Sequence, residues 1–221
     1  MQTAADNAVQ WCDNSNQKIN ATKTQYMMLT LQLNTTISPP ITIKGESISQ
    51  TRSAKLLGVT IDDHLTFTSH TRSVINKARS AVHGLLTLKR HGVHAQSLVK
   101  FYQARIMPIL TYAAPAWYCY IPQYGKDLIE RHQSLCLRLI FPEIASYTER
   151  LDKSKIRRIN DVLSKLCSGY VSKVLSNENH RLHHHIPQKQ SINRHSARLS
   201  DKPILNSRTA LLSKSLFYSY M

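Results

Sequence analysis

The chain has 221 residues, of which 42% are hydrophobic, so it can build a core of domain size and is not disordered throughout. Its 29 Lys and Arg residues against 13 acidic residues give a net charge of +16 and a pI near 9.9. An excess this large indicates a polyanionic partner, either nucleic acid or an anionic membrane, although a merely solvated surface is the alternative.

The cysteines and the apolar stretches exclude several classes of protein. Four cysteines lie far apart with no C-x-x-C pair, which predicts a reduced intracellular protein and argues against a disulfide framework or a zinc ribbon. The N-terminus lacks the cationic start and apolar core of a signal peptide. The apolar run 106–121 is too short to span a membrane and contains Pro108 and Pro115, so we interpret it as a kinked core helix.

The first 62 residues are predicted to be α+β. A helix is expected over Ala4–Asn14. Three short apolar runs, bounded by Pro and Gly, then predict strands at Gln25–Leu33, Ile41–Lys44 and Lys55–Ile61.

Helical spacing begins near residue 66 and continues to about residue 175. The clearest helix is Ser69–Arg90, with Thr68 or Ser69 as its N-cap and Gly92 after its end. Further helices are expected at Ala95–Arg105, at Asp127–Ile140 and at Lys155–Leu175. The side chains expected to be buried are Val74, Ala78, Val82 and Leu85 in the first of these helices, Leu128, Leu135 and Leu139 in the third, and Ile156, Ile159, Leu163, Leu166 and Tyr170 in the fourth. Residues 176–221 read as a basic, partly disordered tail with a short helix at Ser207–Ser215.

Four motifs occur in order between residues 11 and 140. The first runs from Trp11 through Asn16 and Asn20 to Lys23-Thr24 and Met27, and the second contains Leu57-Gly58-Val59, Ile61-Asp62, Leu65, Phe67 and His70. The third contains Ile106, Pro108, Leu110, Tyr112-Ala113, Pro115 and Trp117, and the fourth Gln133 and Arg138–Ile140. Together they resemble the segment that follows the catalytic aspartates in reverse transcriptases of non-LTR retrotransposons, of the LINE, jockey and CR1 type.

The resemblance implies an architecture and a parent activity. Residues 1–62 would be a remnant of the palm sheet, residues 63–175 a helical thumb-like or connecting region, and residues 176–221 the tail. The parent would synthesise DNA on an RNA template with Mg²⁺. Its F/Y-A-D-D hairpin is absent from this sequence, so we expect a truncated chain that holds no metal and is catalytically inactive, since nucleotidyl transfer needs converging carboxylates.

The adjacent pair Asp62-Asp63 does not fit the catalytic hairpin. It follows the L-G-V motif and is predicted to run directly into a helix, with no second strand to close a hairpin. A cap or turn role is therefore the preferred interpretation.

Two further sites are implied by the resemblance. Lys23 matches the family's lysine near the triphosphate, although a lysine before a strand is usually just solvated. Leu57-Gly58-Val59 is similar to the primer grip, where the backbone holds the primer end, but a glycine there can equally mark a strand bulge.

Two basic clusters are candidates for binding phosphates, without sequence preference. Arg72, Arg79, His83 and Arg90 are 7, 4 and 7 residues apart, which places them on one edge of the predicted helix. Lys153, Lys155, Arg157 and Arg158 are predicted at a helix start, where the macrodipole disfavours cations, so Asp152 or a bound polyanion must compensate.

Other interpretations compete with these. Trp117, Tyr118 and Tyr112 are expected to pack between helices and not to stack on bases. His183–His185 with His180 and Cys167 lack metal-ligand spacing. The W-C-x-x-N and K-T segment also looks like the N-terminal region of AlkB-type oxygenases, but no H-x-D triad is present to hold iron. A host nucleic-acid-binding module and a translated relic without a role also stay open.

Overall fold

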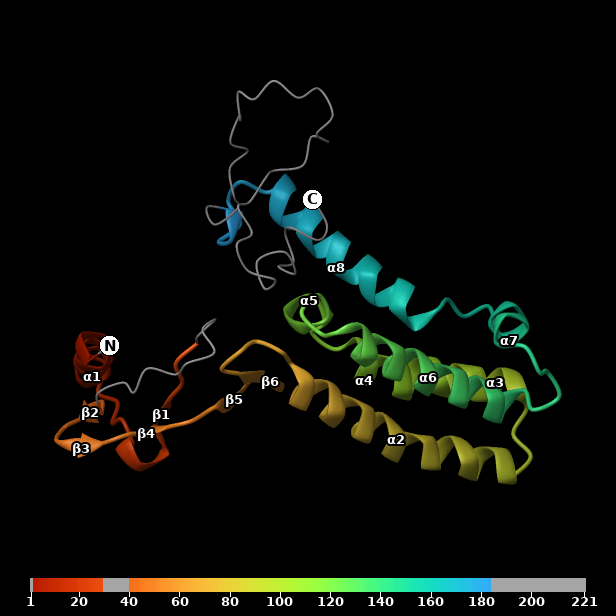
Figure 1. The fold of residues 1–221 in the computed structure, drawn as a ribbon, viewed down its shortest axis with the longest axis horizontal. Helices are drawn as coiled ribbons and strands as arrows, with labels where there is room; N and C mark the ends of the chain where they lie inside the picture. Colours follow the sequence, from red (N-terminus) through yellow and green to blue (C-terminus); the bar gives the residue numbers. More distant parts are fainter. Residues whose placement is uncertain (1, 30–39, 184–221) are drawn as a thin grey trace, which may run out of the picture. The chain divides into compact units, whose positions relative to one another are not determined.

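The computed structural model describes residues 2–29 and 40–183, and its contacts divide the chain into two units, Met1–Leu65 and Thr66–Met221 (Figure 1). The first unit contains short strands and one long helix, and the second is helical within its described part. The fold class is therefore α+β, as predicted. The expected helix at Ser207–Ser215 lies outside the described residues.

The first unit begins with α1 (Gln2–Asn14) and the 3₁₀ turn η1 (Ala21–Lys23). Its strands form three separate two-stranded ladders, which are β1 (Gln25–Tyr26) with β4 (Ser49–Gln50), β2 (Thr42–Ile43) with β3 (Glu46–Ser47), and β5 (Ser53–Leu56) with β6 (Val59–Asp62). The β1–β4 pair is parallel and the other two are antiparallel. The expected single sheet remnant is thus three small ladders in the described residues.

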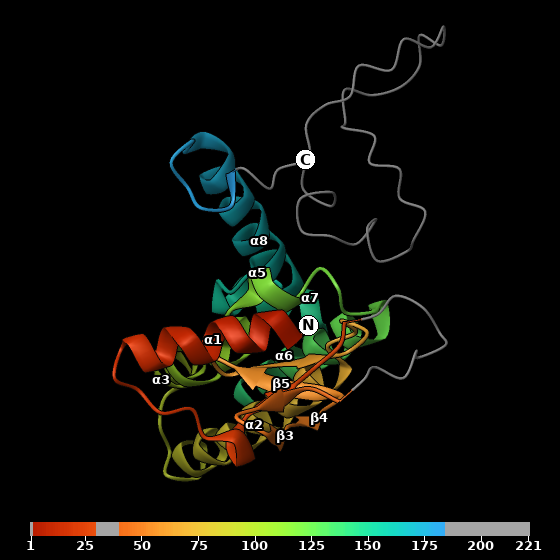
Figure 2. The same ribbon diagram turned by 90° about the vertical axis from the view of Figure 1, so that its left-hand side faces the viewer.

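A small apolar cluster holds the start of this unit together. Ile41, Ile43 and Ile48 are buried, and Ala5 and Val9 of α1 pack against them. Gln2 supports the contact by hydrogen bonding with both backbone groups of Thr42, at 2.8 and 3.0 Å. Figure 2 shows α1 in side view with the short strands beside it. None of the residues of this helix is fully buried.

The run Lys55–Ile61 is not the single strand expected from its sequence. It folds back as the β5–β6 hairpin, with Leu56 paired to Val59 and Ser53 paired to Asp62. The turn residues Leu57 and Gly58 have φ of 47° and 86°, the positive values that a two-residue type I′ turn requires. Asp62 thus lies at the end of this hairpin, opposite Ser53, and the next element in the chain is the helix α2 (Thr68–Arg90), so within the described residues no strand follows Asp62-Asp63, as predicted.

The second unit is a set of packed helices. In chain order these are α2 (Thr68–Arg90), α3 (Ala95–Phe101), the π-helical stretch η2 (Tyr102–Ile106), α4 (Met107–Thr111), α5 (Ala114–Trp117), α6 (Gln123–Ile140), α7 (Tyr147–Ser154) and α8 (Ile159–Ser176). In this unit α2 packs against α3 and α6, while α8 packs against α5 and α6 (Figure 1). None of the helices in the described ranges is long and apolar enough to cross a membrane.

Helix α2 forms where its apolar spacing predicts. Val74, Ala78, Val82 and Leu85 are all buried, and Gly92 follows the helix with φ of 75° while its N–H donates to the carbonyl of Lys89. The N-cap differs from prediction. It is Phe67, in a left-handed conformation, and its side chain is 4% exposed and makes no capping hydrogen bond. The Phe67 ring is buried at this helix start, and the hydroxyl of Thr66 accepts a hydrogen bond from the backbone N–H of Thr68 at 3.4 Å, so neither Thr68 nor Ser69 is the cap.

Several helices differ from prediction in their ends or buried faces. The apolar run 106–121 is broken at Tyr112-Ala113 into α4 and α5, because Ala113 adopts a positive φ of 49°. Leu128, Leu135 and Leu139 are only half-buried, since the core side of α6 is Ile129, Gln133, Cys136 and Ile140. Helix α7 was not predicted, and α8 begins at Ile159 and not at Lys155.

Candidate nucleic-acid interface

A row of cations runs along the exposed side of α2. Arg72, Arg79, His83 and Arg90 are all exposed and share one helical edge, as their spacing predicted. The 23 residues of α2 include five Lys or Arg and no Asp or Glu, so the helix offers no neutralising partner of its own. Within the described residues no ion pair involves any of these three arginines. The edge is thus a positive strip open to an external anion.

Two of these arginines also line a groove between α2 and α6. Its volume is about 280 Å³, and its walls include Arg72, Asn76 and Arg79 from α2 and Tyr124 and Leu128 from α6. The Tyr124 side chain is 66% exposed. Guanidinium and amide groups donate hydrogen bonds to phosphates, and an exposed aromatic ring stacks on bases. The groove therefore combines side chains suited to nucleic acid.

Two histidines of the helices that form the groove are buried. His132 on α6 is 5% exposed, and its Nδ1 lies 3.7 Å from Sγ of Cys136. Burial, and secondarily the charge of Arg79, lower its pKa to about 4, so the imidazole is neutral near pH 7. Burial, with a smaller effect of Lys77, likewise lowers the pKa of His70. Burial thus disfavours the charged form of both histidines, and the positive charge beside the groove at neutral pH is that of the exposed arginines.

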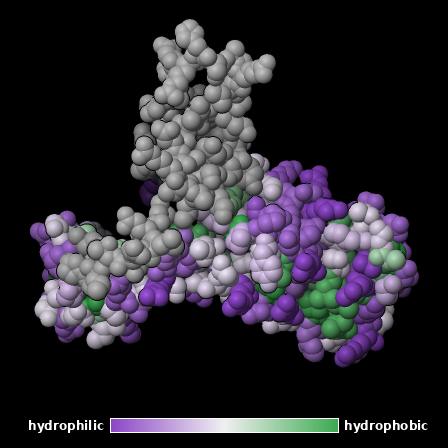
Figure 3. All heavy atoms as spheres, viewed as in Figure 1, coloured by the Kyte–Doolittle hydropathy of each residue, from purple (hydrophilic) through white to green (hydrophobic). Residues whose placement is uncertain are grey.

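The hydropathy of the surface is mixed where Figure 3 shows the helical unit. On this face the unit is largely hydrophilic, with patches of hydrophobic surface among the polar side chains. The groove has the same composition, because Ile75 and Leu128 lie among its polar and cationic residues.

The second basic cluster is not brought together as predicted. Lys153 lies in the last turn of α7 and Lys155 caps its C-terminus, where the macrodipole favours cations, so the expected unfavourable helix start is wrong for both. Lys153 pairs with Glu143 at 3.0 Å, not with Asp152, and its ammonium lies over the ring of Phe141. Arg158 lies over the ring of Tyr147, and Arg157 lines a different groove. The four cations therefore occupy separate environments.

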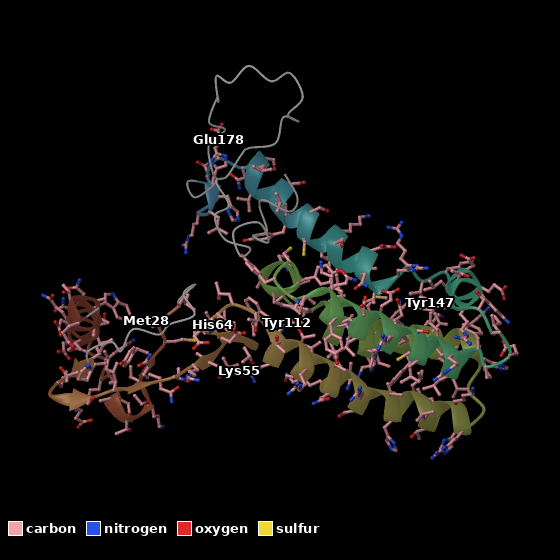
Figure 4. The ribbon with its side chains drawn as sticks, viewed as in Figure 1. Met28, Lys55, His64, Tyr112, Tyr147 and Glu178 are labelled. Carbon is pink, nitrogen blue, oxygen red and sulfur yellow. The ribbon has the colours of Figure 1, made fainter. Side chains whose placement is uncertain are left out.

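A buried glutamine positions the helices behind the interface. Gln133 on α6 is fully buried, and its Oε1 accepts hydrogen bonds from the backbone N–H of Ile159 at 2.7 Å and the hydroxyl of Tyr147 at 2.8 Å. Its Nε2 donates to the carbonyl of Arg157 at 2.9 Å. Tyr147 is labelled in Figure 4 where α7 begins, and its single hydroxyl proton is shared between Oε1 of Gln133 and Oε1 of Glu130, which lies 2.7 Å from the hydroxyl oxygen. The sequence identifies Gln133 only as a motif residue, because its hydrogen-bond partners lie 14 to 26 residues away and no local pattern indicates them.

The sites implied by the resemblance lie in the first unit. Lys23 ends η1 just before β1, with its side chain exposed and its backbone N–H bound to the side chain of Asn20 at 3.0 Å. Leu57-Gly58 is the turn of the β5–β6 hairpin and not a bulge, and Leu57 is 84% exposed. Asp63 pairs with His64 at 2.7 Å, and its backbone N–H donates to the carbonyl of Arg52.

The aromatic and metal interpretations have mixed outcomes. Trp117 and Tyr118 are buried between helices, as expected, but Tyr112 is 55% exposed. Cys167 is buried in the core and the His180 ring packs edge-on against Tyr170. Across the described ranges no three His, Cys, Asp or Glu side chains gather in a metal-binding arrangement. His184 and His185 lie outside those ranges.

The fold and this interface define a class, namely a basic α+β protein whose helical unit presents a cationic edge beside a groove. Over 110 residues, 49% of the chain, it is 28% identical to a probable RNA-directed DNA polymerase from transposon X-element of Drosophila melanogaster. That alignment covers 12% of the relative's length, so the chain spans a small part of it. No protein-family model matches the chain, and no solved structure matches it.

Proposed function

We propose that this chain is a fragment of a non-LTR retrotransposon reverse transcriptase, from the region downstream of the catalytic aspartates, and that it binds nucleic acid without sequence preference. The similarity to a transposon-encoded RNA-directed DNA polymerase supports the parentage. The observation that carries the binding function is the row of exposed arginines on α2, two of which share a groove with Tyr124.

Chemically, this arrangement suits the backbone of a nucleic acid. The guanidinium group of arginine donates paired hydrogen bonds to phosphate oxygens. A row of arginines along one helix is suited to contact successive phosphates of a strand. Tyr124 offers a ring face to an unpaired base at one end of the row. Discrimination between sequences is not expected, because such contacts carry no base-edge readout.

The test compares charge removed from the edge with charge removed elsewhere. The variant Arg72→Gln, Arg79→Gln, Arg90→Gln and a control, Lys18→Gln, Lys55→Gln, Arg105→Gln, lose equal charge, and all six side chains are exposed. Affinity for a short fluorescent single-stranded RNA, measured by anisotropy, should fall about tenfold or more in the first variant and much less in the control. Equal losses in both would show that net charge alone governs binding.

By the same proposal, the chain performs no nucleotidyl transfer of its own. In the parent, Lys23 would have acted as a general acid near the triphosphate, and Leu57-Gly58 would have held the primer end. Without a metal-bound nucleotide, the Lys23 ammonium has no leaving group to protonate. Primer extension with Mg²⁺ or Mn²⁺ is expected to give no product. Incorporation that depends on metal and disappears in Asp62→Asn, Asp63→Asn would overturn this part.

A further inference from the structure

A second groove lies in the helical unit, between α8 and the segment joining α4 to α5. Its volume is about 570 Å³, and its apolar lining includes Ala114 and Pro115 on one side and Val162 and Leu166 on the other. Leu166 was expected to be core but is 43% exposed. The repeat of Val162, Leu166 and Tyr170 at four-residue steps forms an apolar ridge along this groove.

A glycine widens the groove at its centre. Gly169 lies in the interior of α8, where glycine is less favourable than alanine. Packing explains two other helical glycines, since a Cβ on Gly84 would meet the Phe101 ring at 2.9 Å and one on Gly125 would meet Ile121 at 3.4 Å. A Cβ on Gly169 would meet nothing within 4 Å, so no contact in the described structure requires a glycine there. The position is suited to close approach of another chain's backbone.

The rim of the groove is positive. Arg157, Lys165 and Lys173 line it, and within the described part of the chain none of them forms an ion pair. Lys165 and Lys173 are eight residues apart on α8, which corresponds to about 12 Å along the helix. An apolar floor between cations fits a ligand with an apolar stripe flanked by carboxylates.

We infer that this groove docks an amphipathic acidic helix of a partner protein. Apolar side chains spaced three and four residues apart would lie on Val162 and Leu166, the helix backbone would approach Gly169, and its Asp or Glu residues would pair with Lys165 and Lys173. About three turns of helix would fill the groove between Val162 and Lys173.

The positive rim and the apolar lining of the groove argue against three other occupants, namely residues 184–221 of this chain, a second copy of it and nucleic acid. Residues 184–221 of this chain contain six Lys or Arg and one Asp, and a second copy carries +16, so both would be repelled. Nucleic acid matches the charge, but nucleic-acid interfaces are polar, and the floor here is aliphatic. The arginines and the exposed Tyr124 that suit nucleic acid lie in the α2–α6 groove.

The test uses two synthetic helical peptides of equal negative charge, one with leucines at helical spacing and one with alanines in their place. Binding is measured by fluorescence anisotropy. The leucine peptide should bind, and the alanine peptide should bind about tenfold more weakly or worse. Gly169→Trp fills the groove and should lower affinity for the leucine peptide about tenfold, whereas Gly169→Ala should retain it. Thermal unfolding of both variants checks that α8 is intact.

Two further measurements separate this inference from the proposed function. Lys165→Glu, Lys173→Glu should abolish peptide binding, while the triple arginine variant of α2 should leave it unchanged. The inference fails if both peptides bind equally, or if Gly169→Trp binds the leucine peptide as the unaltered chain does. It also fails if Gly169→Trp abolishes binding of single-stranded RNA, because the groove would then belong to nucleic acid.

Discussion

Gln133 has one side chain that satisfies three different groups. Its amide oxygen accepts from the N–H that opens α8 and from the hydroxyl at the start of α7, and its amide nitrogen donates to the link between those helices. All of this occurs at a position with no exposure. Removing such a hub leaves several buried donors and acceptors without partners, which costs more than losing a single exposed hydrogen bond.

Gln133→Ala should therefore lower the free energy of unfolding by roughly 3 kcal/mol, because each orphaned buried group costs about 1–3 kcal/mol. Gln123→Ala is the matched control on the same helix, since Gln123 is exposed and, among the described residues, its side chain donates a hydrogen bond to the side chain of Asp127 alone. The control should change stability by less than about 0.5 kcal/mol. Chemical denaturation measures the free energy of unfolding of both variants. Similar losses in the two would contradict this role of Gln133.

His132 makes stability depend on pH. Its pKa is lowered to about 4 in the folded chain, whereas an unfolded histidine titrates near 6.5. Between these values the unfolded state binds more protons, so stability falls as pH is lowered from about 6.5 to about 4 and is unaffected above that window. The loss from this residue is at most roughly 3 kcal/mol.

Denaturation at several pH values tests this assignment. His132→Gln should flatten the acid side of the stability profile, while His83→Gln, at an exposed site of α2, should leave it unchanged. Part of the slope should remain in His132→Gln, because the pKa of His70 is also lowered by burial. An unaltered profile in His132→Gln would show that another group controls the acid transition.

At the scale of elements, one side of α2 packs in the core and contributes to stability, and another side carries the helix's exposed positive charge. Leu85 is 1% exposed in the apolar stripe, whereas the arginines are exposed along an edge beside that stripe. Leu85→Ala should cost roughly 2–5 kcal/mol, and Leu175→Ala, at a leucine of α8 that is 39% exposed, should cost much less. The triple arginine variant should barely alter stability. A silent Leu85→Ala would mean that this stripe is not core.

The β5–β6 hairpin has an unfavourable residue in its turn. Leu57 adopts a φ of 47°, although a bulky side chain disfavours that region, and asparagine followed by glycine is the preferred pair for this turn. Leu57→Asn should raise the unfolding free energy of the first unit by about 0.5–1 kcal/mol. Leu56→Asn, one residue earlier and within β5, should not stabilise, since asparagine is disfavoured in strands.

At the scale of the whole molecule, the charge of +16 predicts how nucleic-acid affinity responds to salt. Each phosphate contact contributes about −0.9 to the slope of log affinity against log salt on duplex DNA, and about −0.7 on single strands. The unaltered chain should thus bind weakly and lose affinity steeply as salt rises, and the triple arginine variant should have a shallower slope. Tight binding that persists at high salt, or clear preference for one sequence, would contradict non-specific phosphate binding.

Most helices could be predicted because their cause is local. The apolar period of α2 and the glycine that follows it are visible in sequence, and α1 was predicted to within two residues of its observed start. Helix α7 was missed because it has only eight residues and few of them are apolar, and its Arg150 is buried, donating to the carbonyls of Ile144 and Ala145. The hairpin was missed because Leu57 does not look like a turn residue.

The sequence by itself determined the class of the molecule, namely a basic α+β chain with motifs similar to those of a reverse transcriptase and one helix that carries arginines along a single edge. Periodicity and net charge depend only on the order of residues, so they can be read directly. The tertiary structure decided which groups meet: Tyr124 beside Arg72, Gln133 against the start of α8, and Arg157 apart from Lys153. These contacts depend on how the helices pack. That packing is set by the burial of side chains that are far apart in the sequence.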